Sequence, residues 1–257
     1  MLPKEFKPNF YYKLTRLGSS NDGGYMVDIK SILRSKKLIS LGLGTNFDFE
    51  KDYCRLTKNS VDVYDHTITK YSWRNFLLLS FFNNCINYKN FSIKKFLKDF
   101  NLYLEYKKFF KTKNNHFQKR IGYKNQLNHY FKDIELDYII KNEKVPFFLK
   151  VNIPGAEYRT LDQILINQNK ICGLIILFDN IDYHKKLIIN FIKKLKLDLI
   201  HVHGNNNGFY DNNNDPTVIE MIFSNCAQIK SKIKKYKTEG KPSNPRFPEV
   251  KLFFESS

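Results

Sequence analysis

The sequence predicts an α/β fold in which a mostly parallel sheet is covered by helices on both faces. Short apolar runs alternate with segments of helical periodicity along most of the 257 residues. One such run, residues 38–41, ends in Gly42-Leu43-Gly44, where the backbone can turn tightly and approach a ligand. A second run, 61–64, ends on Asp65. In nucleotide-binding α/β folds, a carboxylate at this position accepts hydrogen bonds from ribose hydroxyls.

The first half of the chain contains the two strands that would hold such a ligand. Asp22-Gly23-Gly24 indicates a tight turn between short strands within residues 14–27. The other elements expected here are a short helix or connector at 31–36, the strand 38–41, a helix at 49–58, the strand 61–64 and a helix at 72–82. Residues 83–119 are rich in Lys, Phe, Tyr and Asn, with helical spacing at 91–110. We interpret this segment as a helical insertion or cap over the sheet.

The second half continues the alternation of strands and helices. The expected elements are a short strand at 120–123, a helix at 127–142, a central strand at 147–153, a helix at 158–167, a strand at 173–178, a basic amphipathic helix at 185–197, a strand at 199–203, a polar loop at 204–214, and strands at 217–223 and 250–254. The ligand site of such a sheet lies at the carboxyl ends of its strands. Asp65, Asn152, Asp179 and His203 all follow or end expected strands.

Composition indicates one domain covering residues 1–257. No Pro-, Gly- or Ser-rich linker divides the chain, and no repeat of solenoid period is present. The four cysteines are scattered without a Cys-x-x-Cys pair, which indicates reduced thiols. The first residues lack the apolar core of a signal peptide, and the longest apolar run, 76–82, is too short to span a bilayer. We therefore expect a cytoplasmic protein without a transmembrane segment.

The formal net charge of +18 raises the question of a polyanionic partner. The lysines are spread along the whole chain beside abundant Asn, Ile, Phe and Tyr, so general composition explains the charge better than a dedicated nucleic-acid site. Excess positive charge would still attract anionic substrates such as nucleotide-sugars, and a peripheral contact with an anionic membrane surface stays open.

Several segments together resemble the FkbM-type S-adenosylmethionine-dependent methyltransferases. The matching blocks, in family order, are Asp22-Gly23-Gly24-Tyr25, Ser40-Leu41-Gly42-Leu43-Gly44 with Asp48-Phe49-Glu50, Tyr64-Asp65-His66-Thr67, the segment 149–158, His201-Val202-His203-Gly204-Asn205-Asn206, and Pro245-Arg246-Phe247-Pro248-Glu249. They cover nearly the whole chain, from about residue 16 to residue 254. The resemblance implies a Rossmann-like methyltransferase fold with S-adenosylmethionine as methyl donor.

The chain departs from this family in the block at 149–158. The family usually has Lys-Ile-Asp-Ile-Glu-Gly-Ala-Glu, whereas this chain has Asn152 and Pro154 where the first Asp and the first Glu are expected. Both lost carboxylates could have held a metal or taken a proton. We therefore expect no metal, although Asp179, His184 and His203 form a less favoured set of oxygen and nitrogen ligands.

The candidate cofactor-binding residues lie in the resembling blocks. The glycines would let the methionine portion of the cofactor lie against the backbone, and the carboxylate would accept from the ribose. The candidates are Gly42, Gly44, Thr45, Asp65, His66, Asp22 and Asn152. For the Asp22 turn, a plain hairpin is an equally good interpretation.

Methyl transfer to a hydroxyl requires alignment of the reacting atoms and removal of the hydroxyl proton. His203 and His201 are the first candidates for this base, because imidazole titrates near neutral pH. Their spacing of two puts both on one face of a regular strand, so their depth along the strand decides which one reaches the cleft. Asp179 and Glu157 are further catalytic candidates, although Glu157 could instead complement a helix dipole.

The candidate substrate-binding residues are Asn205, Asn206 and His184. Amide groups suit sugar hydroxyls, although an Asn-rich solvent loop is the alternative. The favoured function is an O-methyltransferase acting on a hydroxyl of a nucleotide-linked or glycan-precursor sugar, as in polysaccharide biosynthesis. The alternative is a non-catalytic, basic nucleic-acid-binding module on the same fold. Methylation of nucleic acid is disfavoured, since the sequence contains no Asn-Pro-Pro-Tyr or Asp-Pro-Pro-Tyr motif.

Overall fold

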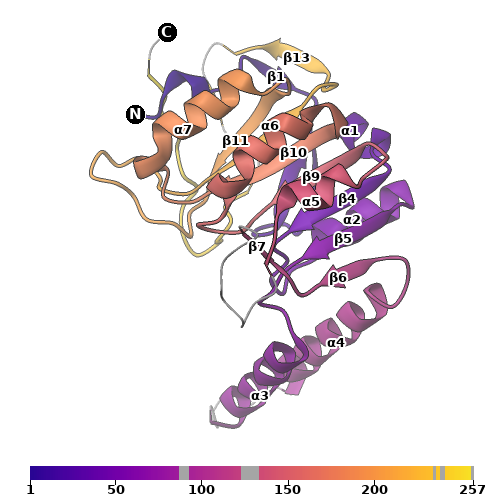
Figure 1. The fold of residues 1–257 in the computed structure, drawn as a ribbon. Helices are drawn as coiled ribbons and strands as arrows, with labels where there is room; N and C mark the ends of the chain where they lie inside the picture. Colours follow the sequence, from indigo (N-terminus) through magenta and orange to yellow (C-terminus); the bar gives the residue numbers. More distant parts are fainter. Residues whose placement is uncertain (87–92, 123–132, 234–235, 238–240, 256–257) are drawn as a thin grey trace.

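A seven-stranded mixed sheet forms the centre of the molecule (Figure 1). The computed structural model describes residues 1–86, 93–122, 133–233, 236–237 and 241–255. The strands of the sheet, in spatial order, are β11 (Asp198–Gly204), β12 (Ile219–Ser224), β10 (Ile171–Phe178), β9 (Phe147–Val151), β4 (Lys37–Leu41), β5 (Ser60–Tyr64) and β6 (Asn115–Phe117). All pairs are parallel except those made by β12, which is antiparallel to both β10 and β11.

The strand order reverses direction beside β4. From β4 the chain moves outward to β5 and β6, and then returns to β9 on the other side of β4. In open α/β sheets, ligands bind outside the carboxyl ends of the strands at such a switch point. The mostly parallel, Rossmann-like α/β sheet expected from the sequence is confirmed. The carboxyl ends of β4, β5 and β9 mark its ligand edge.

Helices cover both faces of the sheet (Figure 1). On one face, α1 (Ile29–Arg34) and α2 (Asp48–Thr57) bury Ile32, Phe49 and Tyr53 against the strands. The opposite face is covered by α5 (Leu136–Lys141), α6 (Leu161–Asn167) and α7 (Ile181–Lys194). Because both faces are covered, strands such as β10 are apolar throughout, with all eight residues buried.

Short elements complete the fold. The hairpin of β2 (Thr15–Gly18) and β3 (Gly24–Val27) contains the expected Asp-Gly-Gly turn. The strands β1 (Phe10–Tyr12) and β13 (Ile229–Lys232) form a second antiparallel pair, and β7 (Arg120–Ile121) pairs in parallel with β8 (Asp133–Ile134). Short 3-10 helices occur at Lys4–Phe6, Glu157–Thr160 and Gln168–Lys170.

The insertion between β5 and β6 is a helical hairpin. Helices α3 (Lys70–Ile86) and α4 (Ile93–Phe109) pack against each other and extend beyond the β6 edge of the sheet (Figure 1). The helix expected at 72–82 is therefore longer at both ends. In the described part of the segment 83–119, the structure has the end of α3, the helix α4 and the edge strand β6. The sequence pattern does not predict the strand β6.

Two expected elements differ in the structure. Residues 250–254 do not join the seven-stranded sheet; Phe254 makes only an isolated bridge to Leu2, while Val250 and Leu252 pack into the core. The helix expected over 127–142 is confirmed only at 136–141, as α5; residues 133–134 form the strand β8 instead, and residues 123–132 lie outside the described part. Within the described ranges, no helix has the length and apolarity needed to cross a membrane.

Candidate active site

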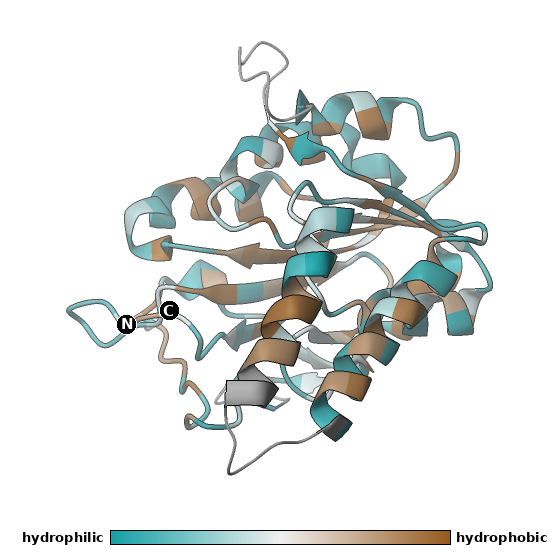
Figure 2. Cartoon of the chain, turned by 90° about the horizontal axis from the view of Figure 1, so that it is seen from below, coloured by the Kyte–Doolittle hydropathy of each residue, from teal (hydrophilic) through white to brown (hydrophobic). Residues whose placement is uncertain are grey.

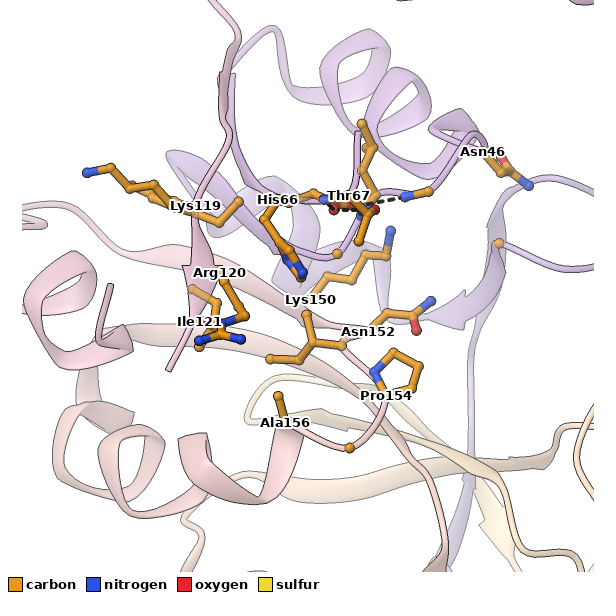
Figure 3. A pocket seen from close by; sticks show the side chains of 18 of the residues that line it. Asn46, His66, Thr67, Lys119, Arg120, Ile121, Lys150, Asn152, Pro154 and Ala156 are labelled. Atoms are coloured by element: carbon orange, nitrogen blue, oxygen red, sulfur yellow. Dashed lines mark hydrogen bonds between the residues drawn. The ribbon is translucent and has the colours of Figure 1, made fainter. Parts of the chain in front are cut away.

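A cavity of about 700 Å³ lies at the carboxyl ends of β4, β5 and β9. Its lining comes from the Asp22 turn, the Gly-x-Gly loop, the segments after β5 and β9, and residues 119–121 (Figure 3). The residues that line it are Asp22, Gly23, Tyr25, Gly42, Leu43, Gly44, Thr45, Asn46, Tyr64, Asp65, His66, Thr67, Lys119, Arg120, Ile121, Lys150, Asn152, Ile153, Pro154, Gly155, Ala156 and Arg159.

The two glycines of the loop after β4 have different structural roles. Both have positive φ, +81° at Gly42 and +61° at Gly44. A Cβ added to Gly42 would lie 1.8 Å from the carbonyl oxygen of Asn152, so the neighbouring strand end requires glycine there. A Cβ on Gly44 would meet no atom of the described residues within 4 Å. Gly44 therefore leaves open space in the cavity wall, where a ligand can lie against the backbone.

Asp65 fixes the shape of this loop. One carboxylate oxygen accepts from the backbone N–H groups of Leu43, at 2.8 Å, and Gly44, at 3.0 Å. The other accepts from the N–H of Thr67, at 2.7 Å, and from its hydroxyl, at 2.6 Å. Burial by itself would raise the pKa of Asp65, but these hydrogen bonds outweigh burial and lower it. Any ribose hydroxyl that approaches Asp65 must therefore compete with Thr67 for the carboxylate.

Asn46 joins the Asp22 turn to the Gly-x-Gly loop. Its side-chain amide donates to the carbonyl oxygen of Asp22 at 2.7 Å, and its own oxygen accepts from the Asp48 N–H at the start of α2. This contact brings Asp22 to the cavity wall beside Gly44, although the two residues are far apart in the sequence.

A buried ion pair adjoins the cavity, which Lys150 lines. The Lys150 ammonium is 2.7 Å from Glu50 Oε1, with side-chain exposures of 3% and 0%. The Ser40 hydroxyl donates to the same oxygen at 2.7 Å. Lys150 Nζ also lies 5.7 Å from the centre of the Tyr25 ring, and the Tyr25 hydroxyl accepts from the Asn152 amide at 3.3 Å. This network supports the positions of two cavity residues, Tyr25 and Asn152.

Basic side chains gather on the opposite wall of the cavity. Lys119, Arg120, Arg159 and His66 all line it. In Figure 3 the Arg120 and His66 side chains extend into the cavity from neighbouring segments. Arg120 pairs with Asp133 through two hydrogen bonds of 2.7 and 2.8 Å. The pKa of Asp133 is lowered, first by this hydrogen bonding, and the charges of His66 and Arg159 add to the effect. Lys119, Arg120 and Arg159 bring three positive charges to this wall against the one carboxylate of Asp133, so the wall is suited to an anion.

The two histidines expected as catalytic bases lie elsewhere. His201 and His203 are on β11, 4% and 6% exposed, and neither lines the cavity. Burial is the main cause that lowers the pKa of His201 to about 3 and that of His203 to about 4, and the Arg16 charge adds to both effects. Since β11 is separated from β9 by β12 and β10, its carboxyl end lies away from the switch point.

The asparagines expected to bind substrate make internal contacts. The Asn205 amide donates to Glu220 Oε1 at 3.1 Å. The Asn206 amide donates to the carbonyl oxygens of Asn244, Phe247 and Pro248. Both residues are buried, and the structure does not bring them to the cavity.

Glu157, Asp179 and His184 gather near the carboxyl end of β10. Glu157 is fully buried and accepts from the Asp179 N–H at 2.9 Å, and burial raises the pKa of Glu157 to about 7. The His184 ring lies against Tyr158, with 3.9 Å between ring centres. None of the three lines the cavity. The described residues contain no cluster of three or more His, Cys, Asp or Glu side chains suited to a metal ion.

The structure thus brings together all seven residues expected to bind the cofactor: Asp22, Gly42, Gly44, Thr45, Asp65, His66 and Asn152. The cavity also contains Tyr25, Lys119, Arg120, Lys150 and Arg159, which the sequence reasoning did not select as site residues. Lys150 could have been selected from the sequence, because it is a charged residue within the apolar run of β9. Such a lysine must find a buried partner or an opening.

The buried carboxyl of Glu220 predicts a pH-dependent stability. Burial first, and the charge of Asp22 second, raise the pKa of Glu220 to about 8 from an ordinary value of 4.5. A carboxyl whose pKa is higher in the folded than in the unfolded state stabilises the folded protein, fully at pH values below the unfolded-state pKa of 4.5. This contribution is lost as the pH rises through the folded-state pKa of about 8. Over the same range the histidines with lowered pKa values contribute in the opposite direction, because they are partly protonated near pH 6.5 only in the unfolded state. This contribution is common to the protein and its Glu220→Gln variant, so it cancels when the two are compared.

We therefore expect the free energy of unfolding of Glu220→Gln to fall less than that of the unsubstituted protein between pH 6.5 and 8, by on the order of 1–2 kcal/mol. Urea unfolding at both pH values measures this difference. Equal slopes for the two proteins would show that Glu220 is ionised throughout this range. Glu157→Gln, at a second buried carboxyl with a raised pKa, is the matched comparison.

Comparisons with known proteins were made at three levels. No protein-family model matches the sequence, and no curated protein does. Similar solved structures include a protein described as a candidate RNA methyltransferase from Pyrococcus horikoshii, at 11% identity and a TM-score of 0.39 over 80% of this chain and 77% of that chain. An rRNA methylase from Streptococcus thermophilus matches at 8% identity and a TM-score of 0.39, over 78% and 93% of the two chains. Because these scores are below 0.5, the proposal below depends on the site alone.

Proposed function

We propose that this chain is an S-adenosylmethionine-dependent O-methyltransferase whose acceptor is a sugar hydroxyl on a phosphate-bearing molecule. The observation that carries the proposal is the open space beside Gly44, in a loop fixed by Asp65 at the switch point of the sheet. This geometry supports a ligand that lies against the backbone after β4 and reaches the end of β5.

The residues around the cavity fit S-adenosylmethionine. A volume of about 700 Å³ suits a ligand of this size. The Gly42 to Gly44 loop would hold the methionine portion, with the Asp22 carboxylate available to its ammonium group, and Asp65 would face the ribose. When bound, the cofactor supplies an activated methyl group on sulfur. The protein must then align an acceptor oxygen with that methyl carbon.

The basic wall supports an anionic acceptor. Lys119, Arg120 and Arg159 provide the cations that a phosphate or diphosphate group would bind. Nucleotide-linked sugars and other sugar phosphates share this chemistry. An acceptor held there would place its sugar toward Asn152 and Pro154, between the phosphate and the cofactor loop. Asn152 offers an amide group to sugar hydroxyls at that point.

His66 is our proposed base for the hydroxyl proton. Among the five histidines that the structure describes, it is the one that lines the cavity. His66→Ala is expected to reduce turnover by about a hundredfold to ten-thousandfold. A much larger loss of cofactor affinity than of turnover would instead place His66 at the ribose.

Calorimetry with S-adenosylmethionine and S-adenosylhomocysteine tests the first part of the proposal. Methyl transfer from labelled S-adenosylmethionine to a panel of nucleotide-sugars and sugar phosphates tests the second. Binding of neither cofactor form would contradict the proposed activity. Cofactor binding together with salt-sensitive transfer to RNA would reject the sugar acceptor.

The basic wall predicts a selective effect on the acceptor. We expect Arg159→Gln to raise the KM for a phosphate-bearing acceptor by about tenfold or more, because a charge-assisted hydrogen bond contributes roughly 1.5–3 kcal/mol. Affinity for S-adenosylmethionine should change less than twofold. Lys194→Gln, at the end of α7 outside the cavity lining, is the matched loss of one positive charge. Equal effects of the two variants would show that only the net charge of the protein matters.

We expect a substitution of Asp65 to change the affinity for the cofactor separately from the affinity for the acceptor. Asp65→Asn exchanges one carboxylate oxygen for an amide that cannot accept from Thr67 or from ribose. We expect S-adenosylmethionine affinity to fall by on the order of 1.5–3 kcal/mol. Thr67→Val removes the competing hydroxyl and should leave affinity unchanged or higher. Wild-type affinity in a folded Asp65→Asn protein would mean that the ribose is held by other residues.

A further inference from the structure

The hairpin of α3 and α4, here called the arm, carries a concentration of exposed hydrophobic side chains. They are 38% to 63% exposed. The residues are Tyr71, Leu78, Leu79, Phe81, Phe82, Leu97, Phe100 and Leu104. Hydrophobic residues colour successive turns of both helices in Figure 2. Exposed apolar patches of this kind mark interaction surfaces.

The packing of the arm covers only part of its apolar surface. Residues 76–82 read Phe-Leu-Leu-Leu-Ser-Phe-Phe, which is apolar around almost the whole helix. Ser80 donates to Asp99 of α4 at 2.6 Å, and the Phe81 ring lies 5.7 Å from the Phe96 ring. A helix that is apolar on all sides is normally buried. The outward side of α3 therefore lacks a partner among the residues that the structure describes.

Positive charge accompanies these apolar residues. The basic residues of the two helices are Lys70, Arg74, Lys94, Lys95, Lys98, Lys107 and Lys108. Their acidic residues are Asp99 and Glu105. Asp99 accepts the hydrogen bond of Ser80, and Glu105 pairs with Lys51 at 3.1 Å. The arm therefore presents a positive surface beside its exposed Leu and Phe side chains.

We propose that the arm docks the protein on an anionic lipid bilayer. Apolar side chains enter the boundary between headgroups and acyl chains, while lysines remain at the level of the anionic headgroups. Basic residues near such a surface are attracted to its negative potential. A second copy of the arm would bring like charges together. Nucleic acid would match the charge and could stack on the aromatic rings, but the exposed Leu78, Leu79 and Leu97 have no base-stacking face and favour an apolar acyl region.

The base of the arm connects docking to the candidate active site. Tyr106 and Phe109 of α4 pack against Phe47, which precedes α2. The Tyr106 hydroxyl is hydrogen-bonded to Nδ1 of His116, and His116 Nε2 lies 3.0 Å from the carbonyl oxygen of Asp65. The arm is thus joined to the loop that lines the cavity. Docking of the arm does not depend on the proposed function. An acceptor sugar phosphate carried on a lipid would use both the docked arm and the cavity.

Co-sedimentation with vesicles tests the docking. The full chain is mixed with vesicles of phosphatidylcholine alone, or of phosphatidylcholine with phosphatidylglycerol, at low and physiological salt. We expect binding to the anionic vesicles and little to the neutral ones. The double variant Leu79→Ser with Phe82→Ser should reduce binding by at least tenfold. The triple variant Lys94→Gln, Lys95→Gln and Lys98→Gln should do the same.

The control replaces exposed apolar residues outside the arm. Ile166 and Tyr183, on α6 and α7, are 76% and 82% exposed. Ile166→Ser with Tyr183→Ser should leave vesicle binding unchanged. Thermal unfolding and calorimetry with S-adenosylmethionine check that each variant is folded, independently of the membrane.

Three outcomes would overturn the proposal. The first is absence of binding to anionic vesicles, or binding that both arm variants retain. The second is a dimer in sedimentation equilibrium that the Leu79 and Phe82 substitutions dissociate, which would identify a second copy as the partner. The third is RNA binding that the lysine substitutions abolish and the Leu79 and Phe82 substitutions leave intact.

Discussion

Gly44→Val is expected to abolish S-adenosylmethionine binding in a protein that still folds. A Cβ at this position meets no atom of the described residues within 4 Å, so the side chain would occupy the space proposed for the cofactor. The folding cost comes from φ of +61°, and for a residue in the left-handed region it is about 1–2 kcal/mol, somewhat more for a β-branched one. Calorimetry should show an affinity loss of at least a hundredfold, or ~2.7 kcal/mol.

Gly155→Val is the matched control for backbone strain. Gly155 has φ of +80°, and its added Cβ also meets no described atom within 4 Å, but it lies after β9 and not in the loop after β4. We expect this variant to keep cofactor affinity and to lose affinity for the acceptor. Normal S-adenosylmethionine binding by Gly44→Val would show that the loop is only a structural turn.

The two glycines of the loop are therefore not equivalent, although the sequence motif treats them alike. At Gly42 even an alanine would place its Cβ 1.8 Å from the Asn152 carbonyl oxygen, so substitution there should destabilise the fold. Only the structure separates a glycine required by the neighbouring strand from one that faces a ligand. Sequence alone identifies the motif and the strand before it.

Local patterns made the cofactor side of the cavity predictable. Gly42, Gly44, Asp65 and His66 follow two strands whose apolar character is evident in the sequence, and parallel neighbours end at the same edge. The structure places them in one cavity with Asn152. The fold class follows from the same alternation of strands and helices, because each strand is buried on both faces.

The acceptor side could not be predicted, since it depends on long-range packing. Arg120 follows the edge strand β6, and Arg159 follows β9, yet both line the same wall. The spacing of the two arginines in the sequence does not indicate that they line the same wall of the cavity. His203 illustrates the converse: it is near the end of a strand, as expected, but the sequence does not give the strand order that puts β11 at the far edge of the sheet.

The second large effect is expected at the buried ion pair. Lys150→Met should destabilise the protein by about 3–5 kcal/mol, because it leaves the Glu50 carboxylate buried without its counter-charge. Glu50 has 0% side-chain exposure, and its Oε2 has no hydrogen-bond partner in the part of the chain that the structure describes. Once Lys150 is removed, the Ser40 hydroxyl at 2.7 Å is its remaining side-chain hydrogen-bond donor. Urea unfolding measures the loss.

A double-mutant cycle separates the charge from the packing. Combining Lys150→Met with Glu50→Gln removes both charges, while the glutamine oxygen can still accept from Ser40. We expect the double variant to be more stable than Lys150→Met alone, because no unpaired buried charge remains. If Lys150→Met is as stable as the unsubstituted protein, Glu50 must already be neutral. If instead the double variant is the least stable, packing of the Lys150 stem against Tyr25 and Phe49 contributes more than the ion pair.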